Sequence, residues 1–245
     1  MTRRLLLDVG NSRVKWTVAD GDQLEPVLHA LHEGDAAAAL DRVTLPKVDE
    51  AWISDVTGPA SREALSKLLR TKCGAVPRFA AAQARCLGLR CAYARPARLG
   101  VDRWLMLLAA WRATGRGACV ASAGTALTFD AVDDAGQHLG GCIAPGLMAM
   151  QRAVLATTRF PADGPDDLYG DGLGRDTEAC VRQGAVHAAL GLLERLAQRF
   201  SANRAWWLTG GDAPLLMPSL DPRWEYRPAL VLEGLLSLAT AAGAP

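Results

Sequence analysis

Asp8 stands at the end of an apolar run and directly before a glycine turn, Val9-Gly10-Asn11-Ser12. A carboxylate at a strand end can hold hydrated Mg²⁺ beside phosphate groups. Glycine lets backbone N–H groups approach a phosphate closely, and the side chains of Asn11 and Ser12 add further donors. Lys15 could neutralise phosphate charge, or could equally be a solvated lysine on a strand face. The segment therefore predicts a turn that binds phosphate.

A second segment, Val120–Ala126, repeats this pattern of apolar strand, glycine turn and small polar residue. The offset that separates Gly10 from Gly124 also pairs Val18 with Val132. It pairs Asp20 with Asp134 as well. Two such hairpins predict a duplicated fold whose copies clamp a polyphosphate in the cleft between them, although a chance match of glycine turns is the alternative.

The hydrophobic pattern supplies the elements that must position these turns. Strands are expected where short apolar or alternating runs occur, and helices where apolar residues recur at helical spacing. The expected strands are 4–9, 13–19, 51–54, 119–123, 127–132, 137–143 and 205–209. The expected helices are 59–70, 101–112, one starting at 145, 176–200 and 228–241, with a loop at 161–174. The Gly115-Arg116-Gly117 break predicts two lobes, 1–114 and 115–245, in an α/β protein.

Composition excludes several classes of protein. The chain has 245 residues, of which 50% are hydrophobic, so a sizeable core can be buried. A formal net charge of +1 gives no electrostatic reason to expect nucleic acid or an anionic membrane as a partner. The N-terminal leucine run meets Asp8 too early for a signal peptide, and no run is long enough to span a membrane. A cytoplasmic location is expected.

The cysteines and histidines give no clear metal site. The six cysteines form no C-x-x-C pair, which favours free thiols in a reducing compartment. His29 and His32 could share a helix face, but two histidines alone make a weak metal site. We expect both to be solvated surface residues.

Three motifs resemble those of the acetate kinase, sugar kinase, Hsp70 and actin superfamily. Asp8–Ser12 is similar to its first phosphate motif, and Ala123–Asp130 to its second. Thr209-Gly210-Gly211-Asp212 is similar to its adenosine motif. Further blocks resemble type III pantothenate kinases in particular. They are Tyr93–Pro96 leading into Leu99–Arg103, Leu139–Gly146, Gly174–Thr177 with Gln183-Gly184, and Leu230–Leu235.

This resemblance implies a fold of two duplicated ribonuclease H-like lobes, the actin-like ATPase fold, with an interlobe cleft. It implies a homodimer that transfers the γ-phosphate of ATP, bound with Mg²⁺, to the primary hydroxyl of pantothenate. That reaction is the first step of coenzyme A biosynthesis. A monovalent cation, K⁺ or NH₄⁺, is the further cofactor that the resemblance implies.

The resemblance also assigns roles to residues. Asp102 would be the general base, and Arg103 would bind the substrate carboxylate or the transferring phosphoryl group. Thr177 would hydrogen-bond the substrate, either within its own protomer or across the dimer interface. The other pantothenate-binding residues would be Tyr93, Gly100 and Val101. The ATP-binding residues would be Asp8, Val9, Gly10, Asn11, Ser12, Arg13, Val14, Lys15, Thr125, Gly210 and Gly211, with Asp8 also holding Mg²⁺.

One position departs from the family pattern. Many members have an aspartate, associated with the monovalent cation, two residues before the second glycine, where this chain has Ser122. A hydroxyl brings no charge, so the cation site is in doubt, and Asp130 is a candidate substitute. Alternative readings remain for the rest: Asp102 and Arg103 as a surface pair at a helix start, Thr177 as an ordinary first-turn residue, another small-molecule kinase, or a non-catalytic transcription-accessory protein.

Overall fold

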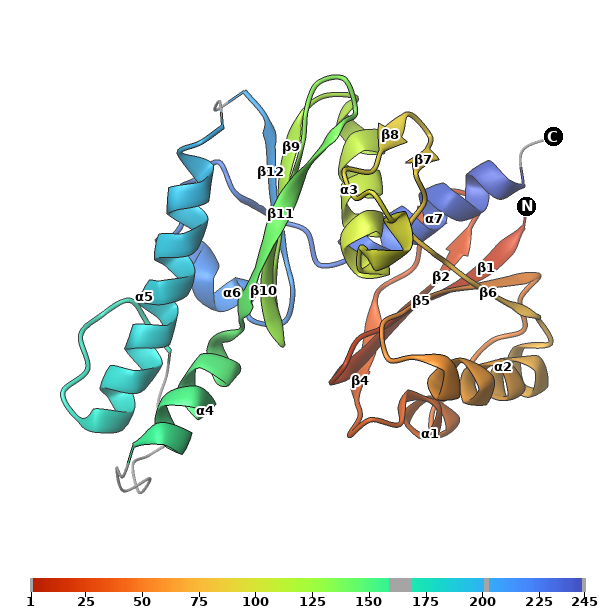
Figure 1. Cartoon of the computed structure of the whole chain (residues 1–245). Coiled ribbons are helices and arrows are strands. Elements are labelled where there is room, and N and C mark those ends of the chain that lie inside the picture. Colours follow the sequence, from red (N-terminus) through yellow and green to blue (C-terminus); the bar gives the residue numbers. More distant parts are fainter. Residues whose placement is uncertain (1, 159–168, 201–202, 244–245) are drawn as a thin grey trace. The chain divides into compact units, whose positions relative to one another are not determined.

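The computed structural model describes residues 2–158, 169–200 and 203–243. The chain forms two compact α/β units (Figure 1). The first unit comprises residues 1–115, 136–138 and 229–245, so the C-terminal helix belongs to it. The second comprises residues 116–135 and 139–228. Among the residues described, no helix is long and apolar enough to cross a membrane.

The first unit is built on a mixed sheet in the order β3-β2-β1-β5-β6, with β4 also pairing with β2. Strand β2 runs antiparallel to β1, whereas β5 is parallel to β1 and β6 is parallel to β5. Its strands are β1 (Arg3–Val9), β2 (Arg13–Asp20), β3 (Gln23–Leu24), β4 (Leu28–Leu31), β5 (Glu50–Asp55), β6 (Pro77–Phe79), β7 (Arg85–Cys86) and β8 (Leu89–Arg90). Its helices are α1 (Ala36–Asp41), α2 (Pro59–Cys73), the 3₁₀ turn η1 (Pro96–Arg98), α3 (Val101–Thr114) and α7 (Leu230–Ala242).

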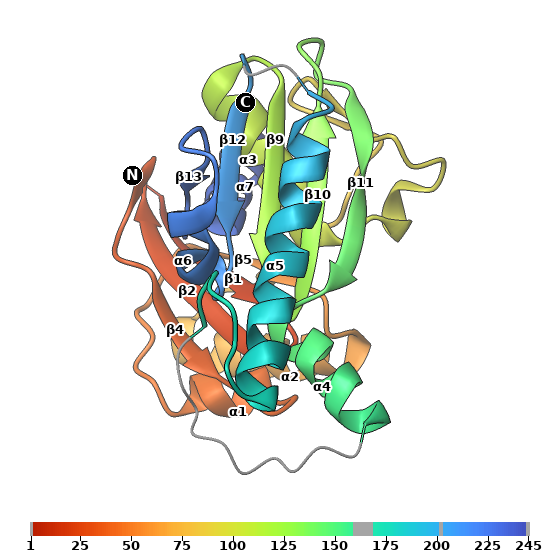
Figure 2. The same cartoon turned by 90° about the vertical axis from the view of Figure 1, so that its left-hand side faces the viewer.

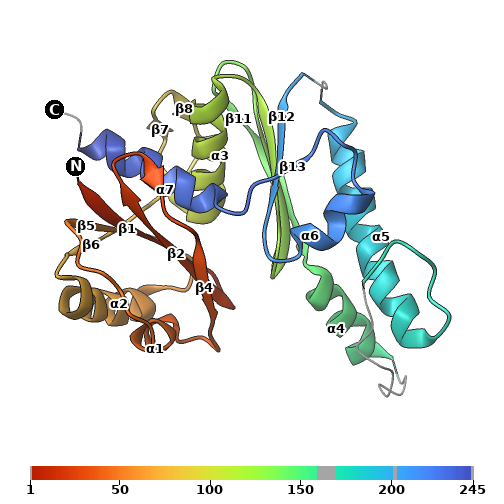
Figure 3. The same cartoon turned by 180° about the vertical axis from the view of Figure 1, so that it is seen from behind.

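Strand alternation gives this sheet two different faces. Leu5, Leu7 and Val9 of β1 point into a core that they share with α1 and α2. Leu6 and Asp8 therefore point to the opposite face. Helices α3 and α7 pack against each other there, and both contact β5 (Figure 3).

The second unit has a mixed sheet in the order β11-β10-β9-β12-β13. Helix α5 lies along one face of this sheet, and α6 lies next to α5 and shares the same hydrophobic core (Figure 2). The strands are β9 (Ala118–Ala123), β10 (Ala126–Val132), β11 (His138–Pro145), β12 (Ala205–Thr209) and β13 (Glu225–Tyr226). The helices are α4 (Leu147–Thr157), α5 (Thr177–Ala197), α6 (Ala213–Leu216) and the 3₁₀ turn η2 (Met217–Ser219).

The two sheets have the same topology, which confirms the predicted duplication. In each, a central strand pairs antiparallel with the next strand in sequence and parallel with a later one: β1 with β2 and β5, β9 with β10 and β12. The sequence offset that aligns Gly10 with Gly124 does not extend to the returning strands. Val18 pairs with Leu5, and its counterpart is Ala131, which pairs with Cys119. The second turn is one residue shorter, so matching Val18 with Val132 was wrong.

The long elements agree with the pattern-based expectations, and most ends lie within a few residues. The pattern missed the helices α1 and α6 and the short strands β3, β4, β6, β7, β8 and β13, because two to six residues carry too little periodicity to stand out. Of the expected loop at 161–174, residues 161–168 lie outside the described part of the chain.

Candidate active site

Asp8 and Lys15 face each other across the first hairpin. They are register partners in β1 and β2, and both are partly buried on the face away from the α1–α2 core. Burial lowers the pKa of Lys15, while the charge of Asp8 acts against that shift. The lysine is therefore held beside the carboxylate and is not an ordinary solvated lysine.

Asp102 lies in the first turn of α3, which begins after the N-cap residue Gly100. Burial, followed by the negative charge of Asp102, raises the pKa of Asp8 to about 6, with Lys15 acting in the opposite direction. The two carboxylates are thus close enough to repel each other. A Cβ atom on Gly100 would lie 2.7 Å from Asp102 Oδ1. Glycine at this position leaves room for the carboxylate.

Arg103 and Tyr93 form the adjoining part of the first unit. Arg103 is only 4% exposed, and its Nη1 donates a hydrogen bond to the Tyr93 hydroxyl oxygen at 3.3 Å. The Tyr93 ring stacks on His138, with centroids 6.1 Å apart. Because Arg103 is buried, the alternative of a surface pair with Asp102 is wrong for this residue. Val101 is also buried, at 8% exposure.

The first glycine turn presents its polar side chains and hides its apolar ones. Asn11 and Ser12 are exposed, and the Gly10 amide donates to the Arg13 carbonyl at 3.1 Å. The side chains of Val9 and Val14 are fully buried in the core. Neither valine therefore offers a side chain to a nucleotide.

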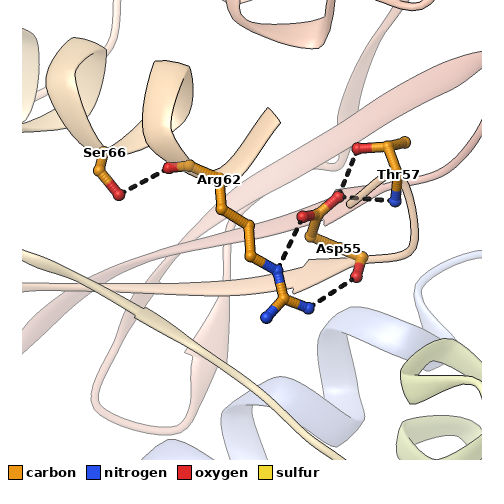
Figure 4. Close-up of polar contacts among 4 residues, drawn as sticks. All are labelled: Asp55, Thr57, Arg62 and Ser66. Carbon is orange, nitrogen blue, oxygen red and sulfur yellow. Dashed lines mark hydrogen bonds and ion pairs between the residues drawn. The ribbon is translucent and has the colours of Figure 1, made fainter. Parts of the chain in front are cut away.

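A buried polar cluster adjoins this turn at the end of β5 (Figure 4). Asp55 is 3% exposed, and Oδ1 accepts from the amide and the hydroxyl of Thr57 at 2.9 and 2.6 Å. Its Oδ2 accepts from Arg62 Nε at 3.1 Å. The next amide, that of Val56, donates to the Val9 carbonyl at 3.2 Å. The cluster therefore fixes the chain that holds the first turn from the β5 side.

In the second unit, the backbone packs tightly around the second glycine turn. Thr125 is exposed at its tip. A Cβ on Gly146 would lie 1.9 Å from the Gly124 carbonyl oxygen, and one on Gly210 would lie 2.0 Å from the Ala123 oxygen. Gly210 also has φ +104°, which favours glycine. The second phosphate motif and the adenosine motif, remote in sequence, are thus in direct contact.

Hydroxyl groups surround the position at which the family pattern has an aspartate. Ser122 pairs in register with Thr128 of β10 and with Thr209 of β12. Register partners share a face, so the three hydroxyls form a row across the sheet, with Asp130 two residues along β10 on the same face. Asp130 is 1% exposed. Across the described residues, no group of three or more His, Cys, Asp and Glu side chains could hold a metal ion.

Thr177 is the first residue of α5, whose N-cap Asp176 accepts a hydrogen bond from the Ala179 amide at 2.7 Å. Thr177 lines a cavity of about 750 Å³ between α4 and α5. The cavity wall is mostly apolar and includes Met150, Val154 and Val181. The structure therefore places Thr177 at a cavity large enough for a small molecule or a protein side chain.

Two residues of the first unit were not recognised from the sequence. His32 was expected on the surface, and this was wrong: it is 9% exposed and bonded to the first turn. Asp55 was not singled out. A carboxylate at the end of a strand, followed two residues later by threonine, was the available signal for Asp55. The histidine gave no local signal because β4 was not predicted.

Two α/β units of one topology, each with a glycine hairpin at the same place, define the actin-like ATPase class. Solved structures support this. A Baf family protein from Campylobacter jejuni has a TM-score of 0.62 at 19% identity, covering 97% of this chain and 98% of that one. The activator of the 2-hydroxyisocaproyl-CoA dehydratase from Clostridium difficile, solved with ADPNP, has a TM-score of 0.55 at 9% identity, covering 98% and 94%.

Sequence comparison is more specific. The type III pantothenate kinase profile matches residues 4–199. The type III pantothenate kinase of Xanthomonas oryzae pv. oryzae is 38% identical over 248 residues, which cover 98% of each chain. The chain belongs to the type III pantothenate kinase family.

Proposed function

We propose that this protein phosphorylates pantothenate with ATP and that Asp102 is the general base. The observation that carries the assignment is the approach of Asp102 to Asp8 in the first unit, where its charge contributes to a pKa of about 6 for Asp8. A kinase of this class needs one carboxylate for Mg²⁺ and another to accept the proton of the attacking hydroxyl. The family match supplies the acceptor, pantothenate.

In this proposal each residue has a distinct part. Asp102 accepts the proton of the primary hydroxyl as its oxygen attacks the γ-phosphorus, and ADP leaves. Asp8 would hold hydrated Mg²⁺, whose charge would screen the phosphates, and Lys15 adds positive charge beside them. Arg103, fixed by Tyr93, presents a planar cation to the pantothenate carboxylate or to the transferring phosphoryl group. The remaining ATP contacts are backbone amides of the two glycine turns and of Gly210-Gly211.

The test is an ATP-dependent assay with pantothenate on the wild type and on Asp102→Asn. Loss of a general base lowers turnover by roughly 10²- to 10⁴-fold, with ATP affinity nearly unchanged. Asp20→Asn is the matched control, because this carboxylate is exposed at the far end of β2. Full activity of the Asp102→Asn variant would show that Asp102 is not the general base. A wild type that phosphorylates another alcohol and not pantothenate would favour a different kinase of this class.

We further propose that a second copy of the chain covers part of the second unit. Several large apolar side chains are exposed there, with Leu173 at 89%, Ile143 at 64% and Met148 at 52%. Apolar side chains with this much exposure are candidates for burial at an interface. The cavity at Thr177 lies in the same unit, so the threonine of one protomer could serve the substrate bound by the other.

Subunit mixing tests this arrangement. Asp102→Asn and Thr177→Val homodimers are each expected to be impaired. If Thr177 acts across the interface, a mixed dimer contains one site with both native residues, and mixing restores activity. If Thr177 acts within its own chain, no site in the mixed dimer is native and activity stays low. Light scattering on the wild type supplies the oligomeric state.

The monovalent cation completes the proposal. The row formed by Ser122, Thr128 and Thr209 offers neutral oxygens, and Asp130 on the same face supplies the negative charge that the family pattern places at position 122. We infer that K⁺ or NH₄⁺ binds more weakly here than at a site with its own aspartate. Activity is then expected to saturate only at high concentrations of either cation.

A further inference from the structure

His32 holds the first glycine turn from the β4 side. The ring Nε2 lies 2.9 Å from the Gly10 carbonyl oxygen, and Nδ1 lies 3.2 Å from the Gly34 amide nitrogen. A carbonyl can only accept and a backbone N–H can only donate, so Nε2 carries the hydrogen and Nδ1 is the acceptor. The two partners therefore fix one neutral form of the ring, and that form donates to the turn.

The backbone of His32 adds a second hydrogen bond to the same turn. Its amide donates to the Ser12 carbonyl at 3.1 Å. On the other side, the Val9 carbonyl accepts from Val56 at 3.2 Å. Three carbonyls of the hairpin are thus bound by protein donors that come from two different segments. Of these donors, the imidazole of His32 is the only side chain.

The bond to the Gly10 carbonyl also sets the direction of the next amide. In a planar trans peptide, the C=O of one residue and the N–H of the next point in opposite directions. When His32 holds the Gly10 carbonyl, the Asn11 N–H points away from His32. Asn11 is exposed, so a ligand can approach the turn at this residue. A turned-over peptide would instead present a carbonyl oxygen, which repels phosphate oxygens.

We propose that His32 is a positioning residue for ATP: it fixes the Gly10–Asn11 peptide in the orientation that directs an amide toward phosphate. This inference rests on the proposed function, because it takes the first turn to bind the ATP phosphates. His32 acts through the turn and does not itself touch the nucleotide. Its loss should therefore weaken ATP binding while leaving the pantothenate site intact.

Substitution of His32 by asparagine or glutamine distinguishes the contributions of the two ring nitrogens. The side-chain amide of His32→Asn can replace Nδ1 as an acceptor but is too short to reach the Gly10 carbonyl. The longer side chain of His32→Gln places an N–H donor near the position of Nε2. We expect His32→Gln to keep a KM for ATP close to wild type. His32→Asn and His32→Ala should raise the KM for ATP roughly tenfold, the scale of one lost hydrogen bond to a partly buried carbonyl, with the KM for pantothenate little changed.

His29 supplies matched controls, because it lies on β4, three residues before His32, and is exposed. His29→Asn and His29→Gln should leave both KM values at the wild-type level. Calorimetric titration with ADPNP should give the same order of affinities, and thermal unfolding shows whether each variant is folded. If His32→Ala does not fold, the comparison of Asn with Gln still decides the question.

The outcomes are distinct. Equal ATP affinity in the Asn and Gln variants, or equal increases in both KM values, would overturn the positioning role. A wild type that binds ADPNP but does not phosphorylate pantothenate would contradict the proposed function. In that case the ADPNP affinities of the variants would still test the role of His32.

Discussion

Replacing Asp8 with asparagine should stabilise the first unit while abolishing activity. The pKa of Asp8 is raised from 3.8 to about 6, mainly by burial and then by Asp102, so the fold favours the neutral carboxyl. Ionising it in the folded protein is correspondingly costly. Once the pH is well above 6, ionisation of Asp8 lowers the free energy of unfolding by about 3 kcal/mol, at about 1.36 kcal/mol per pKa unit. Asparagine has nearly the same shape and no charge.

The sign of the pH dependence follows from the direction of the shift. Because the pKa of Asp8 is raised in the folded state, its contribution to folding stability is fully present below about pH 3.8. That contribution is lost as the pH rises through about 6. The Asp8→Asn variant has no carboxyl group here and does not lose this stability. Its free energy of unfolding, relative to that of the wild type, should therefore rise by about 1.4 kcal/mol between pH 5 and pH 7.5.

Urea unfolding read by hydrogen exchange of the β1 and β2 amides is the appropriate assay, because it reports on the unit that contains Asp8. Asp20→Asn, an exposed carboxylate of the same hairpin, should show no such pH-dependent gain. Stability curves for wild type and Asp8→Asn that stay parallel from pH 5 to pH 7.5 would refute the reasoning. Kinase activity of the variant should fall at least about 100-fold, since the Mg²⁺ ligand is lost.

Three further predictions concern the glycines and Ser122. Gly100→Ala should lower kcat roughly 10- to 100-fold with little change in the melting temperature, because the new Cβ displaces only the carboxylate of Asp102; an unchanged kcat would argue against that residue as the base. Gly210→Ala should destabilise the second unit by more than about 2 kcal/mol in chemical denaturation, since its Cβ would overlap a backbone carbonyl. The control, Gly124→Ala, places its Cβ in open space and should leave the stability nearly unchanged. Equal losses of stability in the two variants would contradict this packing. Ser122→Asp should lower the K⁺ concentration that gives half-maximal activity, and an unchanged cation profile would count against this position as part of the site.

Much of the candidate site could be proposed from the sequence because its motifs are local. A carboxylate followed by a glycine turn and a returning strand is encoded within a dozen residues, so Asp8 and the turn after it could be named without a fold. Repetition of that pattern predicted two units of one topology, which the sheets confirm. The offset between the copies failed on the returning strands, because a turn shorter by one residue shifts all the pairings after it.

What the tertiary structure decided is which of these groups meet. Asp102 raises the pKa of Asp8 only because β-strand alternation and the packing of α3 bring both carboxylates to one face of the first sheet. His32 directly follows β4, a strand with too little periodicity to be recognised from the sequence, and its bond to Gly10 spans 22 residues. A sequence lists residue types and local spacing. Burial, charge interaction and the direction of a peptide group depend on neighbours that only the folded chain supplies.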